Sequence, residues 1–102
     1  MDNNLEAEVL NESGRMNMVE GYRTTPHGSS VSEYFKKAEE RFKKAHELDS
    51  SNPHYTLNIA DALFALGKTD EANKYYKEAA PKMRQGSNHL AGVSRRWRIY
   101  IK

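Results

Sequence analysis

The chain has 102 residues, of which 37 % are hydrophobic and 29 % charged, so we expect one domain with a modest core. No apolar run is long enough for a membrane span, and the lack of cysteine excludes disulfides, thiolate catalysis and cysteine-based zinc sites. Residues 1–30 also lack the positive start and apolar stretch of a secretory or transit signal. We therefore expect an intracellular, cytoplasmic setting, and the sequence points to no organelle.

The net charge of +2 hides an uneven distribution along the chain. Residues 1–30 carry two basic and five acidic residues, and residues 31–80 carry eight basic and nine acidic ones. Residues 81–102 carry six basic residues and no acid. This C-terminal stretch therefore suits an acidic partner or an anionic surface.

Residues 1–30 are rich in Asn, Glu, Gly, Ser, Thr and Met. Gly14, Gly21, Pro26 and Gly28 interrupt any long periodic pattern, and only Leu5, Val9 and Leu10 could share one short helical turn. We predict a flexible or loosely docked acidic segment at 1–30, followed by a helical domain at 31–102.

Capping signals and apolar stripes predict three to four helices in an all-α fold. The first, 31–49, follows a capping box at Ser30–Glu33; the second, 53–66, follows Asn52-Pro53 and ends at Gly67. The third, 69–80, is capped by Thr69 and is ended or kinked by Pro81. A fourth is predicted at 87–101, although Trp97–Lys102 also alternates as a strand would.

One pattern occurs twice in the predicted helices. Ala38, Phe42 and Ala45 are repeated 34 residues later by Ala72, Tyr76 and Ala79. Small residues on one helix face allow a second helix to approach closely, and the aromatic residue between them fills the remaining space. The repeat therefore predicts antiparallel helix pairs that pack closely.

A 34-residue helical period with this pattern resembles the tetratricopeptide repeat. The resemblance covers residues 31–86, about one and a half repeats, and includes the turn from Ala65 through Gly67 to Ala72. Thr56 stands in the family's tryptophan place, and Arg84 stands where the family keeps a terminal proline. An unrelated bundle of helical hairpins is the alternative fold.

The resemblance implies a non-catalytic protein–protein interaction module, either an adaptor or a small subunit of an assembly. Family members bind protein or peptide partners on the first helix of each repeat, which implies four contact residues here: Tyr55, Asn58, Asp61 and Ala65. Asn58 matches an asparagine that holds a peptide's terminal carboxylate in some members, but the upstream helix completing that clamp is not predicted. Because one and a half repeats leave open ends, we expect a homodimer or a place in a larger assembly.

The segment with Arg95, Arg96, Trp97 and Arg98 interleaves arginines with aromatic residues. It could cap the open end of the repeat, bind an acidic partner, or contact nucleic acid or an anionic membrane. The last option defines the alternative function, an accessory protein associated with nucleic acid or membranes.

No pattern in the sequence predicts catalysis, a metal site or a cofactor. The four histidines are dispersed without the His-Glu-x-x-His spacing of a zinc site. Carboxylates such as Glu39 and Glu40 lie among lysines on a helix face, where ion pairing is the expected role.

Overall fold

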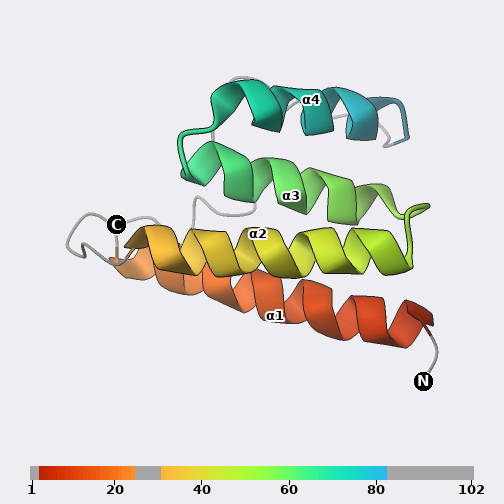
Figure 1. The fold of residues 1–102 in the computed structure, drawn as a ribbon, viewed down its shortest axis with the longest axis horizontal. Coiled ribbons are helices and arrows are strands. Elements are labelled where there is room, and N and C mark those ends of the chain that lie inside the picture. The colour runs from red at the N-terminus through yellow and green to blue at the C-terminus, as the bar shows by residue number, and fades with distance from the viewer. Residues whose placement is uncertain (1–2, 25–30, 83–102) are drawn as a thin grey trace.

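The computed structural model describes residues 3–24 and 31–82, and these residues form four α-helices and one short 3₁₀ turn (Figure 1). The helices are α1 (Asn3–Thr24), α2 (Val31–Leu48), α3 (Pro53–Ala65) and α4 (Thr69–Ala79), and the turn is Ala80–Lys82. Each helix packs against the next, so that two antiparallel hairpins, α1/α2 and α3/α4, are stacked. Strands are absent from these ranges. The all-α fold of antiparallel helix pairs is confirmed.

The first hairpin depends on two glycines in α1. A Cβ atom on Gly14 would lie 2.6 Å from a ring carbon of Phe42, and one on Gly21 would lie 2.5 Å from the ring of Phe35. Both glycines, and both phenylalanines, are seven residues apart, about two helical turns. Hence the two rings of α2 rest directly on the backbone of α1 at two successive points. The Phe35 ring also meets Tyr22 edge-on, at a centroid distance of 5.1 Å.

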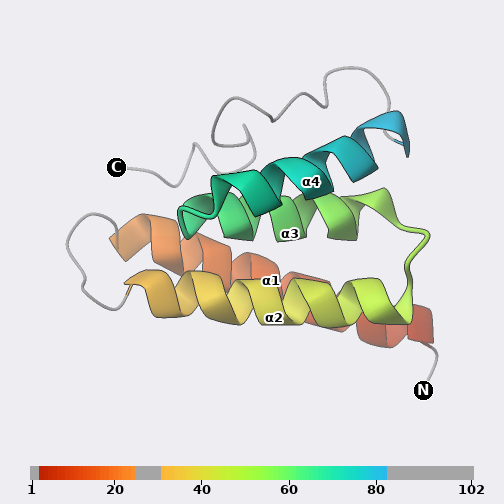
Figure 2. The ribbon, with the colours of Figure 1, turned by 45° about the horizontal axis from the view of Figure 1, so that its top comes forward.

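The prediction of a flexible segment at 1–30 is therefore wrong for residues 3–24. They form a 22-residue helix, whose buried residues include Ala7, Met18 and Tyr22. Figure 2 shows this helix behind α2 and below α3. The physical reason is that Gly14 and Gly21 act as contact points for aromatic rings rather than as helix breakers.

The ends of α3 follow the signals in the sequence. The Asn52 side chain accepts a hydrogen bond from the backbone N–H of His54 at 2.9 Å, and Pro53 occupies the first turn. At the other end Gly67 has a φ of +83°, and its N–H donates to the Phe64 carbonyl. The N–H of Lys68 donates to the Leu63 carbonyl at 2.9 Å, which completes a Schellman motif. The tight turn then leads directly into α4.

The N-cap of α4 lies one residue before the predicted one, at Lys68 instead of Thr69. Lys68 is the N-cap residue and its side chain makes no capping bond, so Thr69 is the first helical residue rather than the cap. Pro81 lies in the 3₁₀ turn that follows Ala79, so it ends the α-helix rather than kinking it. The predicted helix at 87–101 and the capping box at Ser30 lie outside the described residues.

The core contains the repeated pattern. All six residues that share the 34-residue offset are almost fully buried: Ala38, Phe42, Ala45, Ala72, Tyr76 and Ala79. The two aromatic residues and most of the alanines belong to one cluster with Ile59 and Leu63 of α3. Ala45 instead joins Ala7 and Tyr55 in a second cluster, which ties α1, α2 and α3 together.

We expect the substitution Gly14→Ala to lower stability, although alanine favours a helix over glycine by about 1 kcal/mol. The new methyl group would press on the fully buried Phe42 ring, and overpacking of this kind costs about 1–3 kcal/mol. Urea unfolding followed by circular dichroism measures the difference. Ser13→Ala is the matched control, because it improves helix propensity on the same helix and should not lower stability.

The double variant Gly14→Ala with Phe42→Leu separates a clash from a general effect on α1. Its loss of stability should be smaller than the sum of the two single losses, since the smaller side chain makes room for the methyl group. A Gly14→Ala protein as stable as Ser13→Ala would contradict the close packing of α1 on α2.

Candidate functional site

The face of α3 that we expected to contact ligands is mostly inside the molecule. Tyr55, Asn58 and Asp61 are only 1–3 % exposed, whereas Ala65 is partly exposed. The expectation that Asn58 and Asp61 point outward is therefore wrong, and Tyr55, expected near the entrance of the binding face, is also buried. The helix is buried along nine consecutive residues, 55–63. Part of the reason is α1, which the sequence did not predict and which lies against α3.

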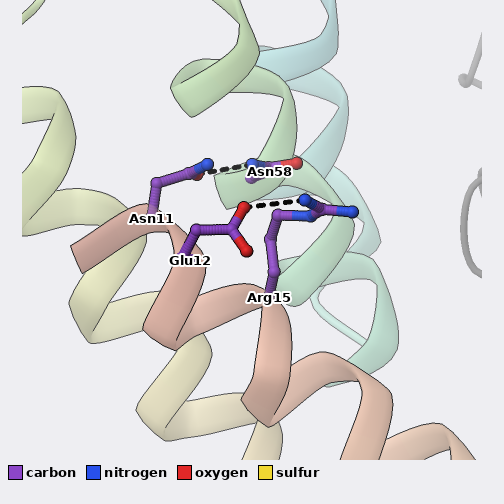
Figure 3. A network of polar contacts seen from close by, with 4 residues as sticks. All are labelled: Asn11, Glu12, Arg15 and Asn58. Carbon is purple, nitrogen blue, oxygen red and sulfur yellow. Dashed lines mark hydrogen bonds and ion pairs between the residues drawn. The ribbon is translucent and has the colours of Figure 1, made fainter. Parts of the chain in front are cut away.

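Asn58 makes a contact between the two hairpins. Its amide nitrogen Nδ2 donates to Oδ1 of Asn11 in α1 at 2.7 Å (Figure 3). Its own Oδ1 is buried and has no hydrogen-bond partner in the part of the chain that the structure describes. A buried amide oxygen without a donor costs about 1–3 kcal/mol, so a group that supplied a donor there would be favoured.

Charged residues of α1 lie next to this amide pair. Arg15 and Glu12 form an ion pair at 2.7 Å, and Figure 3 shows the Arg15 side chain extending from α1 toward α3. The side chains are 43 % and 63 % exposed, so both can be reached from solvent. The Asn11, Glu12, Arg15 and Asn58 side chains together form a polar cluster along the α1–α3 boundary, which we call the interhairpin cluster.

Asp61 holds α3 to α4 instead of facing solvent. Its Oδ1 accepts a hydrogen bond from the Tyr76 hydroxyl at 2.7 Å, and both residues are buried. Its carboxylate also acts on Tyr22 of α1. Burial raises the pKa of the Tyr22 hydroxyl above its usual value, and the nearby Asp61 carboxylate raises it further. Asp61 thus interacts with residues from two other helices and has a structural role.

Tyr55 and His46 are also used in contacts between helices. Tyr55 packs against Ala7 and Ala45, and burial together with the carboxylates of Glu8 and Asp49 raises its pKa.

His46 of α2 lies 3.4 Å from the Thr56 hydroxyl and 3.9 Å from the Glu78 carboxylate. These contacts tie α2 to both helices of the second hairpin.

The other candidate features are the basic C-terminal segment, a metal site and a membrane span. Arg95, Arg96, Trp97 and Arg98 lie outside the described residues. Within the described ranges no three His, Cys, Asp or Glu residues group closely enough to hold a metal ion. The helices of those ranges are also too short or too polar to cross a membrane.

Sequence reasoning missed the α1 half of this site. Asn11, Glu12 and Arg15 belong to the segment that the sequence predicts to be flexible, although their spacing of one and four residues places them along one side of a helix. The signal that could have revealed them is the equal spacing of the glycines in α1 and the phenylalanines in α2.

Comparison with known proteins gives one match. The family profile described as tetratricopeptide repeat matches residues 33–95, more than half of the chain. A search of the curated proteins and a search of the solved structures found no match to this chain. Proteins with this repeat generally mediate protein–protein interactions and are typically non-catalytic.

We expect Tyr76→Phe to lower the free energy of unfolding by about 1–3 kcal/mol, because it removes the donor to the buried Asp61 carboxylate and keeps the ring. Chemical denaturation provides the measurement. Tyr75→Phe is the matched control on the same helix, where a partly buried ring loses its hydroxyl, and it should change stability by less than about 0.5 kcal/mol. Equal effects of the two substitutions would contradict the assigned role of the Tyr76–Asp61 bond.

The raised pKa of Tyr22 predicts a loss of stability at alkaline pH. Since the folded state disfavours the ionised hydroxyl, the free energy of unfolding should fall as the pH rises above about 10, where an unfolded tyrosine ionises. Tyr22→Phe should reduce this fall, and Tyr55 should account for part of what remains. Urea unfolding at pH 8 and at about pH 11 tests this; an unchanged alkaline slope in Tyr22→Phe would refute it.

Proposed function

The chain belongs to the tetratricopeptide repeat family, and on that premise we propose that it is a non-catalytic module that binds a protein or peptide partner at the α1–α3 boundary. It would act as an adaptor or as a small subunit of a larger assembly. The observation that carries the proposal is the interhairpin cluster, in which an exposed arginine lies beside a buried amide that lacks a donor.

The chemistry of this cluster suits a peptide. Arg15 offers guanidinium donors for a carboxylate or a peptide carbonyl, and Glu12 can accept a backbone N–H. Asn58 adds an acceptor, its Oδ1, which is buried and has no donor in the part of the chain that the structure describes. Such donors and acceptors can complement a peptide backbone, which carries both N–H and C=O groups.

The charge of the partner is predicted from the composition of the C-terminal stretch. The predicted acidity of the partner rests on the six basic residues of 81–102, and it stays a prediction. The alternative function, association with nucleic acid or anionic membranes, rests on the same stretch. Since the features of the described ranges favour the peptide-binding role, we do not adopt the alternative.

A library of random twelve-residue peptides displayed on phage provides the probe for this proposal. We expect selected peptides to bind the full chain and to lose at least tenfold in affinity to Arg15→Glu. The fold should survive this substitution, because exposed ion pairs contribute at most about 1 kcal/mol. Lys37→Glu, an exposed position on α2, is the control with the same charge change and should alter affinity less than twofold.

Backbone amide shifts measured by nuclear magnetic resonance locate the bound peptide independently. The largest changes should fall at Asn11, Arg15 and Asn58. Peptides that bind Arg15→Glu as tightly as the parent chain would place the binding surface elsewhere. A failure to select any peptide would count against the module itself.

A further inference from the structure

The outer side of α1 carries an apolar line. Leu5, Val9 and Met16 are 52 %, 59 % and 57 % exposed, and they are the large hydrophobic side chains that the described residues expose. Gly14, which contacts α2, follows Leu5 by nine residues, about two and a half turns, so the line lies opposite the α1–α2 contact. The helices of the described residues therefore leave this line uncovered.

The spacing of the line is that of a seam between paired helices. Positions 5, 9, 12 and 16 are separated by four, three and four residues, the alternation at which two helices meet. Three of these positions hold Leu5, Val9 and Met16, and the fourth holds the exposed Glu12. We call these four residues the outer seam. They fit a helix that presents apolar residues at the same spacing and a cation opposite Glu12.

Two further glutamates border the outer seam. Glu8 directly precedes Val9, and Glu20 lies one turn after Met16; both are exposed. The helical period places them on opposite sides of the line, where the flanking charges of paired helices meet. Arg15, the basic residue within this stretch, is engaged with Glu12 at 2.7 Å. The charge that the borders offer to a partner is therefore acidic.

Charge decides which occupant fits the outer seam. A second copy of α1 would bring the same three glutamates to the contact, and an anionic lipid surface would repel them as well. A helix with Lys or Arg beside its apolar residues instead matches both the line and its borders. Flanking charges of this kind set partner choice in paired helices.

We propose that the outer seam of α1 docks an amphipathic, basic helix of a partner protein. Three apolar side chains and a few ion pairs make a small interface, so the association is weak and falls as salt rises. Glu12 is shared with the interhairpin cluster, but the apolar contacts are separate from it. The proposal therefore does not depend on peptide binding at that cluster.

Two designed helical peptides of three heptads test the proposal. Both carry isoleucine and leucine at the seam positions, and they differ in having either lysine or glutamate at the flanking positions. Fluorescence anisotropy of each labelled peptide, titrated with the full chain, measures binding. We expect the lysine peptide to bind at least tenfold tighter than the glutamate peptide. Equal binding of the two, or no binding of either up to about 1 mM of the chain, would overturn the proposal.

Variants of α1 show whether the peptide binds at the outer seam. Leu5→Gln with Val9→Gln removes apolar surface and introduces a good helix former, and it should weaken binding of the lysine peptide at least tenfold. Glu8→Lys with Glu20→Lys should reverse the preference, so that the glutamate peptide binds tighter. Misfolding does not produce such a gain. A lysine peptide that binds all of these variants like the parent would refute the assigned surface.

The matched control for the charge reversal lies on α2. Glu40→Lys with Glu47→Lys makes the same change in net charge at exposed positions of that helix and should keep the preference of the parent. A reversed preference in this control would mean that net charge alone attracts the peptide, and the seam would then have no specific role. Circular dichroism verifies that each variant is folded.

Two further measurements separate this proposal from its alternatives. Arg15→Glu, which should remove peptide binding at the interhairpin cluster, should still bind the lysine peptide; loss of that binding would place the helix at the cluster instead. Sedimentation equilibrium of the parent chain detects a second copy as the occupant. Self-association that Leu5→Gln with Val9→Gln abolishes would assign the seam to a homodimer and overturn the proposal.

Discussion

The close contact between the backbone of α1 and the phenylalanine rings of α2 is the constraint on which the rest of the structure depends. Gly14 and Gly21 leave space that Phe42 and Phe35 occupy, and any larger residue would move the helices apart. This contact fixes α1 in an antiparallel position at two points along its length. Once α1 is fixed there, its other side meets α3 and brings Asn11 to Asn58.

The neighbours of α3 explain how it can be buried along nine consecutive residues while carrying polar side chains. It packs mainly against α2 and α4, and α1 adds a smaller contact. A buried amide or carboxylate is tolerated when another group bonds to it. Asn11 of α1 supplies the acceptor for Asn58, and Tyr76 of α4 supplies a donor for Asp61. Asn58 and Asp61 therefore each join α3 to another helix, and the geometry of these bonds specifies which helices are neighbours.

The sequence alone predicts α2 and α4, the two helices that carry the pattern repeated after 34 residues. It does not predict α1. In α2 and α4 the buried residues are aromatic or alanine, so their spacing reveals the inner face directly. In α1 this relation is partly reversed, because Gly14 and Gly21 point inward while Leu5, Val9 and Met16 point outward. A search for apolar periodicity finds the wrong side of such a helix. A glycine reveals a helix contact only when the aromatic ring that packs on it is known. Here those rings are Phe42 and Phe35 of α2, which have the same seven-residue spacing as Gly14 and Gly21.

The same error changed the interpretation of the candidate site. If α1 is flexible, α3 is the open end of one and a half repeats, and Asn58 and Asp61 are expected to face solvent. With α1 folded, the described residues form two complete hairpins, and the open face moves to α1. The two hairpins of the described residues are fewer than the three or so units that a helical stack usually needs. The inner face of α1 combines two glycines and an alanine with Met18, Val19 and Tyr22, so the helix that anchors the first hairpin still leaves Leu5, Val9 and Met16 on its outer side.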